Sequence, residues 1–282
     1  IAKLGGSYHG KNMQVFKGLP SGIKKKYGHC SSDKNKGAGY IVMDYISNPV
    51  LLDGHKFDLR TYLLIASTDP WIVFHHDGFI RRSGVKYTNN TYSKTAHITN
   101  LKTQDKYPDH FWGFKQLEHI LHKKHGFPED FMRNTFHGYT KHVTNFVFQA
   151  ARERLKRRRG AFMLFGLDWM LDTNKGIHLL EANGNPSVVH YEGTDLTPFI
   201  WNNMTELLTK IHRDTTKVHN PTVAAGYSHG GWELIFNEAE ETFNKAPYNP
   251  CNLKEYVQTP WPKLLITEHV AALLESKENV IE

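Results

Sequence analysis

Two acidic residues and an amide in the second half of the chain have the types and spacing of a magnesium site. A hairpin closed by the polar loop 172–176 would bring Asp168 within about one residue of lying opposite Glu181. A bulge or a different loop register would close that gap. Asn183 follows Glu181 by two positions and shares its face of the strand. We therefore predict that the three side chains hold Mg²⁺, with ordinary strand-end acids capped by loop amides as the alternative.

A second group of charged residues alternates with apolar ones. Lys56, Asp58 and Arg60 are separated by single apolar residues, so in a strand the three charges share one face while the other face packs into a core. Arg81, at the end of the next hairpin arm, would approach this face and add a second guanidinium for phosphate or carboxylate. The alternative is a half-buried strand whose charged face meets solvent.

Two further segments carry weaker signals. Lys3 precedes a glycine-rich turn that contains Gly10 and Lys11, and such turns cradle polyphosphates because glycines permit close backbone approach. A plain β-turn is the alternative there. His97 and Asn100 lie in a segment that we expect to be a loop, although a lone histidine in such a place is more often structural than catalytic.

Strands and helices in comparable amounts must position these residues. Alternation and short apolar runs predict strands, whereas three- and four-residue spacing predicts helices, and Asp77-Gly78 between apolar runs predicts a hairpin turn. The mixture predicts an α+β fold with a largely antiparallel sheet. We expect strands that end at Lys3 and that span 13–16, 40–46, 57–66, 71–76, 79–82, 161–171 and 177–182, and helices at 111–122, 145–157 with Thr144 as cap, 197–211 and 262–275.

Composition limits the classes of protein that remain. The chain has 282 residues, 39% of them hydrophobic, which predicts a globular protein, and its apolar runs are far shorter than the roughly 20 residues that span a bilayer. We expect no membrane partner. The formal charge of +7 favours anionic partners, but zinc-finger, basic-zipper and RNA-binding signatures are missing, so we expect no nucleic acid. The chain has only two cysteines, Cys30 and Cys251, which indicates a reducing compartment such as the cytosol, with a single bridge between them as the alternative.

Taken in order, these segments resemble the tubulin tyrosine ligase-like family of ATP-grasp enzymes. The similar motifs are Lys-Phe-Asp-Leu-Arg at 56–60, His-Ile-Thr-Asn at 97–100, and Gly-Leu-Asp at 166–168 with Leu-Glu-Ala-Asn at 180–183. Their order and separations are similar to those of the family.

The resemblance implies an ATP-grasp fold that holds a nucleotide between two lobes. Residues 1–46 would be part of the small α/β lobe, and residues 47–282 would be the larger, mostly antiparallel lobe with closing helices. We also expect an upstream domain that this chain lacks.

For the nucleotide, the resemblance implies contacts to phosphate and to adenine. Lys3 would hold the α- and β-phosphates of ATP, with Gly10 and Lys11 in a loop that folds over them. Asn12 stands in that loop where relatives usually have glycine.

At the adenine end, Tyr45 and Ile46 would form the hinge through their backbone, and Lys56 would reach the adenine edge. The hinge reads Met43-Asp44-Tyr45. Relatives usually have Gln at the first of these positions, Lys or Arg at the second and Tyr at the third, so a side-chain contact to adenine is lost here.

For catalysis, the resemblance implies that Arg60 and Arg81 face the γ-phosphate and the substrate carboxylate. Asp58 would lie near the ribose and the acceptor, and His97 and Asn100 would complete the phosphate end of the cleft. The same three ligands predicted above would hold Mg²⁺.

The implied activity is an ATP-dependent ligation of a free amino acid to a carboxylate of a protein acceptor through an acyl phosphate. Tubulin C-terminal tails or microtubules would be the acidic acceptor, modified by tyrosylation, glutamylation or glycylation, in the cytoplasm on the cytoskeleton, including the cilium or axoneme. Two alternatives stay open: a catalytically silent relative that binds microtubules as a structural component, which Met43 and Asn12 favour, and a small-molecule ATP-grasp ligase.

Overall fold

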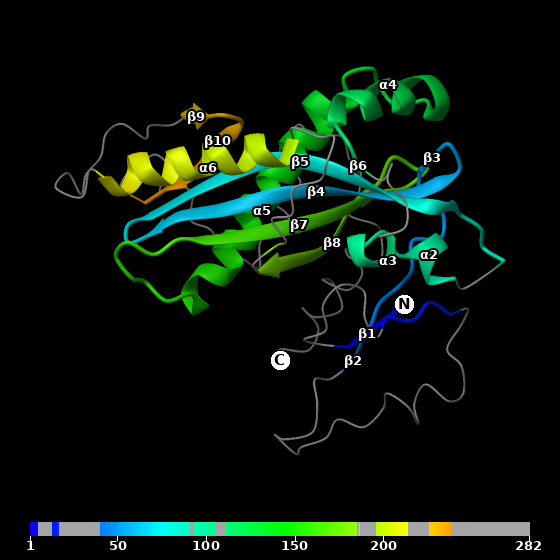
Figure 1. Cartoon of the computed structure of the whole chain (residues 1–282), viewed down its shortest axis with the longest axis horizontal. Helices are drawn as coiled ribbons and strands as arrows, with labels where there is room; N and C mark the ends of the chain where they lie inside the picture. The colour runs from blue at the N-terminus through cyan, green and yellow to red at the C-terminus, as the bar shows by residue number, and fades with distance from the viewer. Residues whose placement is uncertain are drawn as a thin grey trace, which may run out of the picture.

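A large antiparallel sheet dominates the computed structural model (Figure 1). The structure describes residues 1–4, 13–16, 40–90, 93–104, 111–184, 186, 196–213 and 226–238. The sheet has eight strands in the order β8-β7-β4-β5-β10-β9, with β3 on β4 and β6 on β5. Its strands are β3 (Leu51–Leu52), β4 (His55–Thr68), β5 (Trp71–Lys86), β6 (Phe111–Trp112), β7 (Met163–Leu171), β8 (Ile177–Gly184), β9 (Ser228–His229) and β10 (Trp232–Asn237).

Helices cover both faces of this sheet, with α6 on one face and α4, η1 and α5 on the other (Figure 1). The predicted α+β class is therefore confirmed. No helix among the described residues is both long and apolar enough to cross a membrane. The helices are α2 (Lys94–His97), α3 (Leu101–Gln104), α4 (Phe114–His125), the π-helix η1 (Phe131–Phe136), α5 (His137–Ala151), the 3₁₀-helix η2 (Arg152–Arg154) and α6 (Leu196–Arg213).

Strand β4 alternates its side chains between two cores and is buried on both faces. Leu59 and Leu63 join Phe148 in the core beneath η1 and α5. Tyr62 and Leu64 belong to the second core, beneath α6. Both hydrophobic cores therefore pack against this strand.

The charged residues of β4 continue the α6 face toward the start of the strand. Lys56, Asp58 and Arg60 are only 3%, 3% and 6% exposed. The alternative of a solvent-facing charged strand is therefore wrong. Burial of three charges on one strand requires partners, because an isolated buried charge costs several kcal/mol, on the order of the whole stability of a domain.

The predicted hairpin turn at Asp77-Gly78 is wrong, because β5 runs through both residues. Arg60 pairs with Phe79 and Thr61 pairs with Asp77, so Gly78 is the extra residue of a bulge. A Cβ added to Gly78 would lie 2.5 Å from the backbone oxygen of Arg60. The glycine is thus required by a close approach of two strands and not by a turn.

Two predicted helices have wrong boundaries. Residues 111–112 pair with β5 as strand β6, and the helix begins only after Gly113. Helix α5 begins at His137 and ends at Ala151, so the expected span 145–157 starts too late and Thr144 is not its cap. In the first turns of α5, polar side chains face the sheet. The sequence there therefore lacks the apolar periodicity that predicts a helix.

A separate two-stranded sheet pairs β1 (Ala2–Leu4) with β2 (Tyr40–Val42), with Lys3 opposite Ile41. The expected strand 40–46 is therefore shorter, and 13–16 contributes only a bridge between Gln14 and Ala2. The predicted helix 262–275 lies outside the described residues, and the lobe boundary at residue 46 stays a prediction.

Candidate active site

A cleft lies between the start of the chain, the segment after β2, the residues that follow α2, and strands β4, β7 and β8. The space between its walls is about 620 Å³ when the part open to solvent is included. Residues far apart in the sequence thus meet in one place. The predicted site residues that line it are Tyr45, Ile46, Lys56, Asp58, His97, Asn100, Asp168 and Glu181.

Two arginines and two aspartates form a buried layer beneath the cleft. Arg60 donates to Asp168 from Nε at 2.5 Å and from Nη2 at 3.1 Å. Arg81 donates to Asp58 from Nε at 2.6 Å and from Nη2 at 2.7 Å, and its Nη2 also lies 2.9 Å from Asp168 Oδ2. The two positive and two negative charges balance, as buried ions must.

The strand register explains this layer. Arg60 is the cross-strand partner of Asp168 in the β4–β7 ladder, and Asp58 is the partner of Arg81 in the β4–β5 ladder. Directly opposed side chains on one face lie close enough to interact. Gly166 leaves room for the guanidinium, since a Cβ there would lie 2.7 Å from Arg60 Nη1.

The two aspartates differ in their tendency to ionise. Burial would raise the pKa of Asp168, but Arg81 and Arg60 outweigh burial and hold that pKa below its ordinary value. Burial raises the pKa of Asp58 above its ordinary value, although Arg81 and the hydroxyl of Thr99, which donates to Asp58 Oδ2, both oppose that shift. Asp168 is thus the carboxylate kept ionised beside the cleft.

Asp168 and Glu181 lie directly opposite each other in the β7–β8 ladder. A register shift just after Asp168 is a bulge, which is one of the two ways that the sequence left open for closing the gap between them. Asn183 Nδ2 donates to Asp168 Oδ2 at 3.2 Å and to Glu181 Oε1 at 3.0 Å. A half-turn of this amide would present its oxygen instead. Two carboxylates and an amide oxygen suit a small hard cation, and Mg²⁺ binding stays a prediction.

Lys56, Tyr45 and His97 form a hydrogen-bonded group at the other end of the cleft. Lys56 Nζ donates to Tyr45 Oη at 2.7 Å and lies 4.3 Å from the centre of its ring. Tyr45 Oη lies 2.7 Å from His97 Nδ1. Burial lowers the pKa of Lys56 to about 8, with Asp58 acting in the opposite direction. This amine therefore titrates close to neutral pH.

Comparison with known proteins identifies the protein family of this chain. A family model described as the tubulin-tyrosine ligase family matches residues 1–220. The chain belongs to the tubulin-tyrosine ligase family. Its α+β fold is therefore of the ATP-grasp class, as the sequence predicts.

Three relatives illustrate the range of this family. Protein polyglycylase TTLL10 of Macaca fascicularis is 35% identical over 159 residues, which cover 52% of this chain and 26% of that protein. Inactive polyglycylase TTLL10 of Homo sapiens is 33% identical over 159 residues, with 52% and 24% covered. Probable tubulin polyglutamylase TTLL9 of Bos taurus is 31% identical over 225 residues, with 74% and 46% covered. The chain spans about a quarter of the length of the TTLL10 proteins that it matches.

The other residues to which the family resemblance gives a role lie at different depths relative to the cleft. Arg60 and Arg81 are beneath the cleft with their guanidinium groups paired to protein carboxylates, so their contact with phosphate stays a prediction. The backbone of Lys3 lies in β1. Gly10 and Lys11 lie outside the described residues.

Sequence reasoning assigned no role to two residues that complete the site. Thr99 donates to Asp58, and the Tyr87 ring lies 5.2 Å from that of His97. Thr99 could have been found from its place in the His-x-Thr-Asn run. For Tyr87 the sequence carries no comparable signal, because its position depends on the end of β5.

Proposed function

We propose that this chain is the catalytic body of an ATP-dependent ligase that joins a free amino acid to a carboxylate of a protein acceptor. The observation that supports this most is the convergence of Asp168, Glu181 and Asn183 beside the buried pairs of Arg60 and Arg81 with aspartates, at one cleft.

The adenine and the metal would occupy opposite ends of the cleft, with the phosphates of the nucleotide between them. The adenine would be held by Tyr45, Ile46 and Lys56. The phosphates would be held by Lys3, Gly10 and Lys11, as the family resemblance implies. Asp168, Glu181 and Asn183 would hold Mg²⁺. Bound ATP would transfer its γ-phosphoryl group to the acceptor carboxylate, which gives an acyl phosphate and ADP. The amine of the amino acid would then attack the acyl carbon and expel inorganic phosphate.

The arginines would act through exchange of partners. Arg81 shares Asp168 Oδ2 with Asn183, at 2.9 Å and 3.2 Å. A cation held by Asp168 would compete for the same oxygen, and N–H groups of Arg81 and Arg60 would then become available to phosphate and to the acceptor carboxylate. Donors aimed at these groups would stabilise the negative charge that develops there.

Asn100 and Asp58 would orient the reacting groups, whereas His97, which the resemblance assigned to the phosphate end, contacts Tyr45 and would act at the adenine end. All three line the cleft. Asp58 fixes Arg81 through two hydrogen bonds and receives one from Thr99, so its carboxylate is held in one position. Most of the rate enhancement would come from such positioning.

The acceptor would be an acidic protein segment, and tubulin C-terminal tails or microtubules fit this description. The chain has a formal charge of +7, and relatives are named tubulin glycylase and probable tubulin polyglutamylase. Electrostatic attraction of this kind weakens with salt. The corresponding location is the cytoplasm on the cytoskeleton, including the cilium or axoneme.

A second candidate function is microtubule binding without catalysis. One human relative is named as inactive, and Met43 occupies the cleft where family members usually carry a glutamine at the hinge. Such a protein would keep the basic surface and lose nucleotide affinity.

The two candidates are separated by incubating the protein with ATP, Mg²⁺, a mixture of amino acids and tubulin, followed by mass spectrometry of the tubulin. A ligase adds the mass of one or more amino-acid residues, and Glu181→Gln abolishes that addition. Co-sedimentation with microtubules without any mass shift, in a protein that binds no ATP, would establish the silent function instead.

A further inference from the structure

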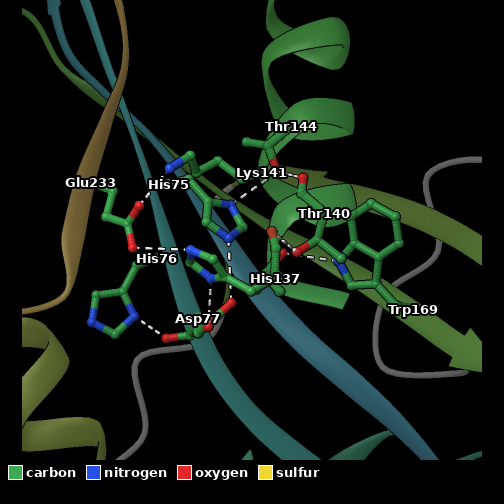
Figure 2. A network of polar contacts seen from close by, with 10 residues as sticks. His75, His76, Asp77, His137, Thr140, Lys141, Thr144, Trp169 and Glu233 are labelled. Atoms are coloured by element: carbon green, nitrogen blue, oxygen red, sulfur yellow. Dashed lines mark hydrogen bonds and ion pairs between the residues drawn. The ribbon is translucent and has the colours of Figure 1, made fainter. Parts of the chain in front are cut away.

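A second polar cluster lies on the α5 face of the sheet, away from the face that carries Asp58 and Arg60. Figure 2 shows His75 and Asp77 from β5 pointing toward His137 at the start of α5, with Glu233 of β10 beside them. One ligand atom from each of His75, Asp77 and His137 lies within 4.8 Å of the other two. Among the described residues, these three are the one such cluster of histidine, cysteine and acidic side chains.

The hydrogen bonds of His75 fix which ring nitrogen carries the proton. Thr144 Oγ1 donates to the backbone oxygen of Thr140 at 2.6 Å, so it can only accept from His75 Nδ1, 3.1 Å away. The proton of the neutral ring is therefore on Nδ1. The lone pair of Nε2 then faces Asp77 Oδ1 at 3.4 Å, which is longer than the roughly 2.7–2.9 Å of a charge-assisted hydrogen bond. Two acceptors that face each other leave room for a cation between them.

The second histidine has the outer contact that metal ligands commonly have. His137 Nδ1 lies 2.8 Å from Asp77 Oδ2, and its Nε2 lies 3.0 Å from Glu233 Oε1. Glu233 is held in turn by Lys141 Nζ at 2.6 Å. A carboxylate on the far nitrogen fixes the ring orientation. The near nitrogen donates to Asp77 in this structure, and a bound ion would replace that proton, because a metal binds the neutral imidazole. Thr144 fixes the ring of His75 in the same way, because it accepts from Nδ1 and leaves Nε2 to bind the ion.

We propose that His75 Nε2, His137 Nδ1 and the Asp77 carboxylate bind one divalent transition metal of the Zn²⁺ class. Bonds of about 2.0–2.1 Å in a tetrahedral zinc site place neighbouring ligands roughly 3.3 Å apart. The 3.4 Å between His75 and Asp77 matches this distance, and the 2.8 Å to His137 needs a small opening.

The donor set separates this site from the cleft. Two imidazoles and one carboxylate suit Zn²⁺, whereas Mg²⁺ prefers oxygen ligands throughout. The Asp77 and His137 side chains are 36% and 24% exposed, so the ion can enter from solvent and take water as its fourth ligand. Bound there, it joins the first turn of α5 to β5 and, through Glu233, to β10.

The sequence contains a partial signal for this site in the run His75-His76-Asp77. Alternation in β5 puts His75 and Asp77 on one face and His76 on the other, where its ring packs 4.8 Å from Trp232. The third ligand lies 60 positions from Asp77, so only the fold brings it in.

The test uses the whole chain, stripped of metal and kept in excess Mg²⁺ so that the cleft is not available to other ions. Calorimetric titration with Zn²⁺ should show one tight site, and Zn²⁺ should raise the thermal midpoint, because an ion that binds only the folded state stabilises it. Co²⁺ in its place should give the strong visible absorption of a four-coordinate ion.

Three variants test which residues bind the Zn²⁺ ion. His137→Gln should abolish the tight site, and Glu233→Gln, which keeps all three ligands, should weaken Zn²⁺ binding about 10- to 100-fold. His178→Gln is the matched control, because His178 also pairs with an aspartate, Asp172 at 2.9 Å, but has no second histidine. It should bind Zn²⁺ as the unaltered chain does.

Several results would overturn the proposal. These are an unaltered chain without a tight Zn²⁺ site, a six-coordinate Co²⁺ spectrum, or equal losses in Glu233→Gln and His178→Gln. The Glu233 variant decides the matter even if His137→Gln fails to fold.

Discussion

The carboxylates of Asp168 and Glu181 meet across the β7–β8 ladder and are joined by the amide of Asn183, at 3.2 Å and 3.0 Å. Three oxygen-bearing side chains are thus aimed at one place by two neighbouring strands. The arginines beneath them supply a counter-charge that keeps Asp168 ionised.

Glu181→Gln should keep the fold and abolish Mg²⁺-dependent ATP turnover, because an amide replaces one of two carboxylates at the predicted metal position. ATP consumption and circular dichroism measure the two properties. Glu118→Gln, which alters an exposed ion pair with Arg133, is the control and should turn over normally. Near-normal ATP consumption by Glu181→Gln would remove this residue from the metal site.

Arg60→Lys and Arg81→Lys should each lower turnover roughly 10²- to 10³-fold while changing ATP affinity little, because lysine keeps the charge and loses the bidentate fork. Steady-state kinetics with saturating acceptor, together with ATP titration, separates the two effects. Arg133→Lys on the surface is the matched control. Normal turnover by both cleft variants contradicts the proposed electrostatic step.

Gly166→Ala should lower turnover and cost about 1–3 kcal/mol of stability, because the new methyl group overlaps Arg60. Its Cβ would lie 2.7 Å from Arg60 Nη1 and 3.0 Å from Pro186 Cβ. Gly184→Ala in the neighbouring strand is the control, since its nearest neighbour would be 3.6 Å away on Phe165. Equal behaviour of the two variants in urea denaturation and turnover would show that Gly166 does not make space for the guanidinium.

Met43→Gln should improve discrimination of ATP from GTP. A side-chain hydrogen bond to adenine is worth about 0.5–1.5 kcal/mol net, so the ratio of the two affinities should rise roughly 2- to 12-fold. Calorimetric titration of both nucleotides in Mg²⁺ measures it. A failure of the unaltered chain to bind ATP even at millimolar concentration would favour the silent function.

Lys56 should make stability depend on pH above neutrality. Its pKa is about 8 in the folded chain against 10.5 ordinarily, so between these values the unfolded state binds more protons. The free energy of unfolding should therefore rise with pH in this window, by at most about 1.4 kcal/mol per pH unit. Urea denaturation between about pH 7.5 and pH 9.5 measures the slope. Lys56→Met keeps an unbranched side chain without the amine and should lose this contribution; parallel slopes in the two proteins would show that Lys56 is not the titrating group.

Local patterns identified most of the strands and helices, although not all of their bounds, and one half of the site. Counting residues across a short hairpin loop brings Asp168 within about one residue of Glu181, and the alternation of Lys56, Asp58 and Arg60 identifies a strand whose charges share a face. Both inferences use neighbours in the sequence only.

Long-range pairing could not be predicted in the same way. Arg60 meets Asp168 across 108 positions, because β4 lies between β5 and β7 in the sheet, and no local pattern determines that order. The bulge at Gly78 depends on the backbone of Arg60 in the adjacent strand. Helix α5 was predicted to start too late because Thr140 and Thr144, polar by type, are fully buried.

The most direct test of the central claim is the fate of the acceptor's oxygen. An acidic acceptor peptide whose carboxylates carry ¹⁸O is incubated with the protein, ATP, Mg²⁺ and the amino acid that the tubulin assay identifies. Activation through an acyl phosphate moves one carboxylate oxygen to the phosphate released when the amine attacks. Ligation through an acyl phosphate should give one ¹⁸O in inorganic phosphate for each amide bond formed, and neither product should form with Glu181→Gln. Amide formation with unlabelled phosphate, or ATP binding without any amide formation, would contradict it.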